Sequence, residues 1–335
     1  MIVIDKVVLM RRGYAHCYQK LSKDEPTVRA QGERMKSIVE LRNVNVAIKG
    51  KPIIHNLNMS VPQGQVYGFL GRNGAGKTTV MKTLLSLLPM KTGEFLLHGR
   101  KIQNGNVDYL RFIGSLIEEP AYYPHLSAVD NLRFIDRIRG TSTDIDSLCS
   151  IVGLYDVRKQ KVSSYSLGMK QRLGIASALV GDPEILLLDE PTNGLDPDGI
   201  REIRILLKDL AEQQGKTVII SSHLLAEIEQ TASVVGIISN GRMLYEGAIS
   251  GLIGGEKTCV TVGNPQQFED YMRSKGLAFS AIDDTSYAIR YCTGQDASDF
   301  VKNAVQNSIS IEKIWDEKRS LEESFLKITG EMSGR

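Results

Sequence analysis

The sequence predicts an α/β protein followed by a smaller α+β domain at its C-terminal end. Between residues 37 and 248, short apolar runs alternate with segments of helical spacing, which is typical of a parallel sheet covered by helices. From residue 249 the expected order changes to strand, helix, strand, strand, helix, strand. A chain of 335 residues is long enough for about two domains, each with its own core.

Composition narrows the class of protein. The chain is 42% hydrophobic and 24% charged, and its formal net charge of +2 gives no reason to expect nucleic acid as the main partner. No apolar run approaches the roughly 18 to 20 residues that span a bilayer, and we find no secretory signal. We therefore predict a cytosolic protein with free thiols, rather than a disulfide framework or a zinc site, at its scattered cysteines: Cys17, Cys149, Cys259 and Cys292.

Residues 1–36 differ from the rest of the chain. They carry eight Lys/Arg against four Asp/Glu, and strand-like alternation begins only at Ser37, just after a second methionine, Met35. We expect this segment to be poorly ordered. Two interpretations stay open: residues 1–34 are an extension upstream of the natural start, or they are a regulatory tail.

Gly71–Thr78 spells G-x-x-x-x-G-K-T between an expected strand, Val66–Leu70, and an expected helix, Lys77–Leu88. Glycines in such a loop let backbone N–H groups point at phosphates, and the helix N-terminus adds partial positive charge. Lys77 would reach the β/γ-phosphates and the Thr78 hydroxyl would ligand Mg²⁺. The alternative, a Gly-rich turn that only links strand to helix, does not explain the full pattern. The predicted nucleoside triphosphate site comprises Gly71, Arg72, Asn73, Gly74, Ala75, Gly76, Lys77, Thr78 and Thr79.

Two carboxylates follow the next apolar strand, Ile185–Leu188. Asp189 can hold Mg²⁺, since hard cations prefer oxygen ligands. Glu190 could polarise the attacking water, and a positioned general base contributes roughly 10²–10⁴ in rate. His223 follows strand Val218–Ser222 at the corresponding place and could contact the γ-phosphate and that water. An exposed acidic pair and a structural histidine are the alternatives.

A second anion-binding helix start lies in Tyr165–Arg172, ahead of an expected helix, Lys170–Val180. The Ser166 hydroxyl and the Gly168 N–H would face the anion. Because one P-loop suffices for one phosphate chain, two such sites indicate a nucleotide held between two copies of the protein.

The remaining elements complete the predicted architecture. A helix is expected over Ile200–Gln214, and Asn240-Gly241 is a strong hairpin signal. A glycine-rich break near Gly251 precedes a ferredoxin-like, split βαβ unit with no catalytic constellation, which suggests an accessory or dimer-bracing domain. Its expected elements are Thr258–Val262, Pro265–Lys275, Ala278–Ile282, Ser286–Cys292, Ala297–Gln306 and Ile309–Trp315, closed by an amphipathic helix, Leu321–Ile328.

Together these motifs resemble those of the ATP-binding subunit of an ABC transporter. The Walker A motif is 71–78, the signature is Ser166–Gln171, Walker B is 185–190, the D-loop is Gly194–Asp196, and the H-loop is His223. The resemblance implies a P-loop NTPase core with a helical signature subdomain.

That resemblance covers residues 37–248 and leaves 249–335 as the accessory domain. It implies that two such domains, identical or homologous, pair head to tail, so that each ATP lies between one P-loop and the partner's signature. It further implies ATP and Mg²⁺ as cofactors, and hydrolysis that drives a separate integral membrane permease at the cytoplasmic face of the cell membrane.

Three positions depart from the family pattern. Leu167 replaces the first signature glycine, whereas Ser166 and Gly168 remain. Glu118 stands where most members have the Q-loop Gln; its carboxylate can accept from water or ligand Mg²⁺, which implies a catalytic and metal role. Ile48 stands where an aromatic would stack on adenine, an interaction of about 1–3 kcal/mol. An alignment shifted by one or two residues is the alternative there.

Glu118 in S-L-I-E-E-P, the run Y-S-L-G-M-K-Q-R and the C-terminal Leu321–Leu326 most resemble the bacitracin and lantibiotic export and immunity branch. This resemblance implies removal of peptide antibiotics through a separately encoded permease. Drug, lipid and sodium exporters share the layout and stay as alternatives, as do a soluble non-transport ABC ATPase and a permease-bound regulator with vestigial hydrolysis. The permease would dock on the helical insert between Glu118 and Ser166, with Tyr122, Tyr123 and Leu126 as candidates, unless these side chains pack in the core.

Overall fold

The computed structural model describes residues 36–103, 105–253, 257–289, 297–317 and 320–330. It divides into two units, with the boundary between Gly247 and Ala248. The interpretation of residues 1–36 as a poorly ordered extension therefore concerns a segment that lies, but for Lys36, outside the described residues.

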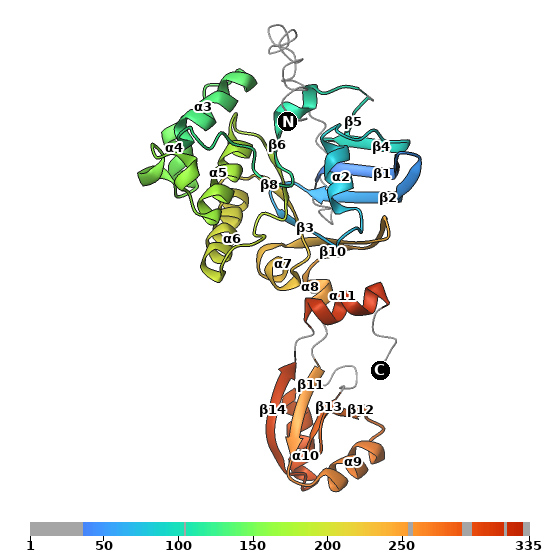
Figure 1. Cartoon of the computed structure of the whole chain (residues 1–335). Helices are drawn as coiled ribbons and strands as arrows, with labels where there is room; N and C mark the ends of the chain where they lie inside the picture. The colour runs from blue at the N-terminus through green and yellow to red at the C-terminus, as the bar shows by residue number, and fades with distance from the viewer. Residues whose placement is uncertain (1–35, 104, 254–256, 290–296, 318–319, 331–335) are drawn as a thin grey trace, which may run out of the picture. The chain divides into compact units, whose positions relative to one another are not determined.

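A six-stranded sheet forms the centre of the first unit, in the order β10-β9-β3-β8-β7-β6 (Figure 1). From β9 to β6, every neighbouring pair is parallel. The strands are β3 (Val66–Leu70), β6 (Ile113–Leu116), β7 (Ile185–Asp189), β8 (Thr217–Ser222), β9 (Val234–Ser239) and β10 (Arg242–Ala248).

The three middle strands of this sheet place the polar motifs at one edge. Every residue of β3, β7 and β8 is buried, as expected for a parallel sheet with both faces covered. In the register, Leu70 pairs with Ser222, and Asp189 pairs with Ser221. The carboxyl ends of the three strands, and the loops that follow them, therefore lie side by side.

A second, antiparallel sheet has the order β2-β1-β4-β5. Its inner face shares one hydrophobic core with the central sheet and the first helix, in which Tyr67, Phe69 and Met81 are fully buried. The strands are β1 (Ser37–Ile48), β2 (Lys51–Pro62), β4 (Thr92–Leu97) and β5 (Arg100–Lys101).

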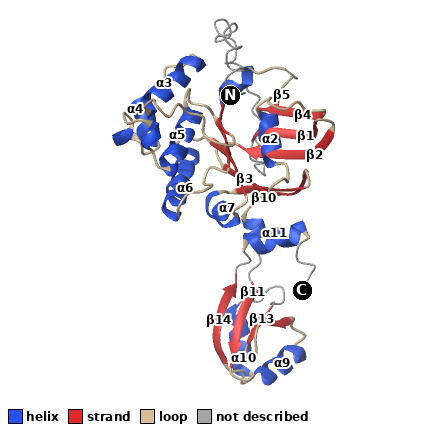
Figure 2. Ribbon diagram, in the orientation of Figure 1, coloured by secondary structure: helices blue, strands red, loops and turns tan. Residues whose placement is uncertain are grey.

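Helices cover the central sheet, and α3, α4 and α5 gather beside it as a helical subdomain (Figure 2). This subdomain lies in the chain between β6 and β7, where the helical insert was expected. The helices of the first unit are α2 (Lys77–Leu84), α3 (Ala128–Arg139), α4 (Ile145–Ile151), α5 (Leu167–Leu179), α6 (Pro197–Glu212) and α7 (Leu225–Thr231), with short 3₁₀ turns η2 (Asp108–Phe112), η3 (Tyr155–Val157) and η4 (Val162–Ser164).

Three predicted helix ends were wrong. Helix α5 begins at Leu167 and not at Lys170, because the Ser166 side chain accepts from Met169 N and caps it. Helix α6 begins at Pro197 and not at Ile200, because Asp196 caps it and proline suits the first turn. Helix α2 ends at Leu84 and not at Leu88, since Ser86 has a φ of 54°.

The second unit contains a four-stranded antiparallel sheet in the order β12-β13-β11-β14. With two helices in the order β-α-β-β-α-β, this is the predicted ferredoxin-like unit, although the last residues expected in β13 lie outside the described residues. Its elements are β11 (Lys257–Val262), α9 (Pro265–Ser274), β12 (Phe279–Ala281), β13 (Ser286–Ile289), α10 (Ala297–Gln306) and β14 (Ile311–Glu317), with α8 (Ser250–Ile253) and α11 (Leu321–Thr329) flanking them.

The core of this second unit lies between its sheet and the helices α9 and α10. Val260, Phe268 and Phe300 are almost completely buried there. Helix α11 is tied to α8 by the Ser324 hydroxyl, which donates to the Leu252 carbonyl at 2.6 Å.

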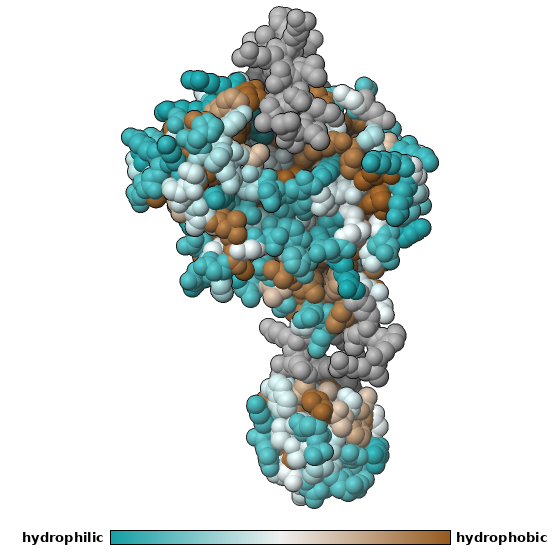
Figure 3. All heavy atoms as spheres, in the orientation of Figure 1, coloured by the Kyte–Doolittle hydropathy of each residue, from teal (hydrophilic) through white to brown (hydrophobic). Residues whose placement is uncertain are grey.

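The visible surface of the first unit is mostly polar (Figure 3), and the two described cysteines are buried. Hydrophilic side chains cover most of the visible face of the first unit, with scattered apolar residues among them (Figure 3). Among the described residues, no helix is long and apolar enough to cross a bilayer. Cys149 and Cys259 are buried free thiols, as predicted, and the other two cysteines lie outside the described residues.

Candidate nucleotide-binding and hydrolysis site

The loop after β3 contains glycines at positions where a side chain would be strained or would clash. Gly74 and Gly76 have φ values of 82° and 113°. A Cβ on Gly71 would lie 2.6 Å from the Ile238 carbonyl oxygen, and one on Gly76 would lie 2.6 Å from Ile54 Cδ1. The loop is therefore pressed against the ends of neighbouring strands, and the N-terminus of α2 follows it directly. Free N–H groups at such a terminus attract an anion.

Lys77 places a positive charge at this loop. Its side chain is 6% exposed, and Nζ donates to the Gly71 carbonyl oxygen at 2.6 Å. The same Nζ lies 3.4 Å from Oε1 of Glu190. The ammonium group is thus held at the mouth of the loop, where it can neutralise phosphate oxygens.

Thr78, Asp189 and Ser221 form a connected group beside the loop. The Thr78 hydroxyl donates to Asp189 Oδ2 at 2.7 Å, and the Ser221 hydroxyl donates to Oδ1. Hydroxyl and carboxylate oxygens are the ligands that Mg²⁺ prefers, so these residues fit a magnesium site. Among the described residues, no three His, Cys, Asp or Glu side chains cluster as a metal cage. A cation here would need phosphate or water oxygens as its other ligands.

Glu190 connects Lys77 to His223. Its Oε2 lies 2.7 Å from His223 Nδ1, while its Oε1 faces Lys77. The Glu190 backbone has a φ of 50°, a left-handed conformation that costs of order 1–3 kcal/mol for a residue other than glycine. Its N–H donates to the Ser221 carbonyl at 3.2 Å, which helps to hold that conformation. Both side chains are partly exposed, at 23% for Glu190 and 39% for His223, so water can reach them.

In the described part of the chain, Glu118 pairs with a residue of α2 and not with the group around Glu190. It follows β6 with a φ of 63°, and its carboxylate is 65% exposed and pairs with Lys82 of α2 at 2.5 Å. Among the described residues it makes no recorded contact with Thr78 or Asp189. The link to α2 nevertheless ties the Glu118 loop to the helix that follows the P-loop.

The two predicted signature residues lie at another exposed surface. Ser166 caps α5 by accepting from Met169 N at 3.2 Å. Gly168 is half-buried two residues on, and Leu167 is 49% exposed and lies against Gly194 of a later loop. Among the described residues, neither Ser166 nor Gly168 forms a hydrogen bond with the P-loop of its own chain.

Sequence reasoning missed Ser221. This residue binds Asp189 through its hydroxyl and Glu190 through both its hydroxyl and its carbonyl oxygen. A signal was available, because Ser221 and Ser222 end a strand with an apolar middle, at the edge where the other polar groups collect.

Comparisons with known proteins agree with this arrangement. The ABC transporter family matches residues 54–193. The bacitracin transport ATP-binding protein BcrA of Enterococcus faecalis is 36% identical over 309 residues, which cover 88% of this chain and 97% of that protein. The chain belongs to the ATP-binding proteins of the ABC transporter family.

Two further relatives cover mainly the ATPase part of the chain. The lantibiotic transport ATP-binding protein SrtF of Streptococcus pyogenes is 42% identical over 210 residues, 62% of this chain and 90% of that protein. The structure of cbiO1 from Clostridium perfringens, part of the ABC transporter complex cbiONQ, superposes with a TM-score of 0.59 at 27% identity and covers 65% of this chain and 90% of that one. The first unit is thus an ABC ATPase with a P-loop NTPase core, which binds and hydrolyses ATP.

Proposed function

We propose that this ABC ATPase drives a separate membrane permease that exports peptide antibiotics of the bacitracin or lantibiotic type. The observation that carries the proposal is the extent of the similarity to BcrA. The alignment spans 309 residues, whereas the first unit ends at Gly247, so the shared length includes part of the C-terminal unit. We propose residues 37–248 as the ATPase domain and 249–335 as the accessory domain, and the unit boundary between Gly247 and Ala248 supports this division.

The site geometry supports a separate role for each polar residue of the ATPase site. Lys77 neutralises the β/γ-phosphates, and Thr78 and Asp189 hold Mg²⁺, which would stabilise charge on the phosphate oxygens when bound. Glu190 accepts a proton from the attacking water, because its carboxylate lies between Lys77 and His223 and is open to solvent. His223 orients Glu190 through the 2.7 Å contact. Glu118 would act on water or Mg²⁺, because its Oε1 pairs with Lys82 while the side chain stays 65% exposed.

A second ATP-binding subunit completes the site in this proposal. Ser166 is exposed and Gly168 half-buried at the start of α5, and in the part of the chain that the structure describes neither forms a hydrogen bond with the P-loop. A helix N-terminus that is open to solvent can bind the phosphates of a nucleotide held by another copy. The expected assembly is a head-to-tail dimer of this chain or of this chain with a homologue.

The permease is proposed to dock on the helical subdomain, at the cytoplasmic face of the membrane. Tyr123, Phe134 and Ile138 are between 36% and 40% exposed, and the rings of Tyr123 and Phe134 lie 5.4 Å apart. These side chains form an apolar surface on and beside α3. The other two candidates, Tyr122 and Leu126, are half-buried and therefore expose less surface to a partner.

Growth under antibiotic challenge tests the substrate class. Cells that carry the chain and its permease are grown with wild-type protein, Glu190→Gln or the surface control Glu212→Gln, across bacitracin, lantibiotics and unrelated drugs. We expect Glu190→Gln alone to sensitise cells, and only to the peptides. Sensitivity to unrelated drugs instead would indicate a general drug, lipid or ion exporter, and unchanged growth on every peptide would contradict peptide-antibiotic export.

A further inference from the structure

The two chain segments that carry Glu190 and His223 are joined by a side-chain contact at each end. Thr192 follows Glu190 by two residues, and its hydroxyl donates to Oε2 of Glu227 on α7 at 2.5 Å. At the other end, Glu190 contacts His223, which lies just before the same helix. The segments 190–192 and 223–227 therefore form a closed ring with two side-chain hydrogen bonds.

Both segments are stiff, so a change at one bond reaches the other. Pro191 stands between Glu190 and Thr192 and has a fixed φ. Glu227 lies in the first turn of α7, where its N–H donates to the Leu224 carbonyl oxygen at 3.2 Å. The Glu190 backbone, in its left-handed conformation, needs such restraint on both sides.

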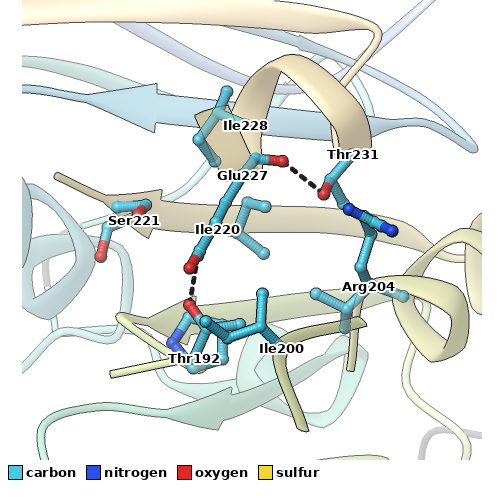
Figure 4. Close-up of a pocket in the computed structure, with 11 residues that line it drawn as sticks. Thr192, Ile200, Arg204, Ile220, Ser221, Glu227, Ile228 and Thr231 are labelled. Atoms are coloured by element: carbon cyan, nitrogen blue, oxygen red, sulfur yellow. Dashed lines mark hydrogen bonds between the residues drawn. The ribbon is translucent and has the colours of Figure 1, made fainter. Parts of the chain in front are cut away.

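The bond between Thr192 and Glu227 lies in a pocket with mainly apolar walls (Figure 4). The walls come from α6, β8 and α7 and include Ile200, Leu207 and Ile228. Figure 4 shows the Glu227 carboxylate reaching from α7 to the Thr192 hydroxyl. Hydrogen bonds gain strength in such surroundings because water competes less for the partners.

The surroundings of the second Glu227 carboxylate oxygen indicate that this residue does more than stabilise the fold. Its Oε1 is buried and has no hydrogen-bond partner among the described residues. Arg204 also lines the pocket, but its recorded hydrogen bond goes to Gln230. A buried, unpaired carboxylate oxygen costs stability, and such groups call for another explanation, such as a role at a functional site.

We propose that Glu227 is a positioning residue for ATP hydrolysis, which holds the turn at Thr192 so that Glu190 and His223 stay in contact. This proposal rests on the proposed role of Glu190 and extends it. It assigns no contact between Glu227 and the nucleotide. Loss of the bond should therefore slow the chemical step and leave nucleotide affinity almost unchanged.

Steady-state ATPase kinetics of the full chain test the proposal. We expect Thr192→Val and Glu227→Ala each to lower kcat by about ten- to a hundredfold, the cost of a small misplacement of a catalytic group, with the KM for ATP within about twofold of wild type. Thr192→Ser keeps the hydroxyl and Glu227→Gln keeps an acceptor oxygen, so both should retain most of the activity. Because both residues act through one bond, the double variant should be no slower than the slower single variant.

Thr231→Val is the matched control, since it removes a hydroxyl from the same pocket but leaves the Thr192 bond intact. Wild-type kcat in Thr192→Val, or losses that multiply in the double variant, would overturn the proposal. If Glu227→Ala does not fold, the Thr192→Val and Thr192→Ser pair decides alone. Glu190→Gln distinguishes failure of the proposed function from failure of the positioning role. Full ATP turnover in Glu190→Gln rejects Glu190 as the base. Loss of turnover in Glu190→Gln together with wild-type turnover in Thr192→Val rejects only the positioning role of Glu227.

Discussion

At the scale of single residues, the hydrolysis site is a chain of polar contacts with Glu190 at its centre. Lys77 lies on one side of that carboxylate and His223 on the other. Asp189, one residue earlier, is occupied by the hydroxyls of Thr78 and Ser221. Two adjacent carboxylates thus have different surroundings, which suits one to a metal ion and the other to water.

The residue at position 48 predicts loose selection of the base. Ile48 lies at the end of β1, is 37% exposed, and offers no π-face to adenine. We expect GTP to support hydrolysis nearly as well as ATP, and Ile48→Tyr to tighten nucleotide binding by about 1–3 kcal/mol. Competition binding with both nucleotides measures this. A strong preference of the wild-type chain for ATP would show that another residue reads the base.

At the scale of elements, the β9–β10 hairpin supports the P-loop. Asn240 and Gly241 have φ values of 47° and 72°, the pair of left-handed residues that a type I′ turn requires, so the predicted hairpin is confirmed. Gly241 N donates to the Ala75 carbonyl at 2.9 Å, and the Gly241 carbonyl accepts from His55 N at the same distance. The turn therefore links β2 to the nucleotide loop.

Substitutions at two glycines with similar backbone angles distinguish the cost of backbone strain from the cost of a steric clash. Gly50 and Gly241 have φ values of 80° and 72°, but a Cβ would meet nothing within 4 Å at Gly50 and would lie 1.9 Å from the Ile53 carbonyl oxygen at Gly241. Gly50→Ala should cost about 1–2 kcal/mol of unfolding free energy from strain alone. Gly241→Ala should cost about 1–3 kcal/mol more and weaken ATP binding. Equal shifts of the urea midpoint in the two variants would show that the contact with Ile53 adds no cost at Gly241.

The sequence predicts the strands better than the contacts between distant segments. Apolar runs located β3, β7 and β8, and parallel pairing then brought Asp189 and His223 to one edge. Helix starts were missed although Ser166 and Asp196 carried capping signals. The bond between Thr192 and Glu227 joins residues 35 apart, and it depends on how α7 packs, which no local pattern encodes.

At the scale of the whole molecule, the hydrolysis site and the C-terminal domain belong to different units of the chain. All the residues of the polar network lie in the first unit, which ends at Gly247. The second unit has its own core and a sheet order typical of a ferredoxin-like domain. The similarity to BcrA extends into this second unit, and this is why a role specific to one exporter branch is proposed for the whole chain.

We propose that Glu190 is the base of an ATP-dependent, dimeric ATPase. The most direct measurement compares ATP turnover and dimer formation in the wild-type chain, Glu190→Gln and Glu212→Gln, an exposed control on α6. We expect Glu190→Gln to bind ATP, to lose about 10²–10⁴ in turnover and to accumulate as an ATP-held dimer, while the control behaves as wild type. Wild-type turnover in Glu190→Gln, with no dimer in ATP, would show that Glu190 is not the base.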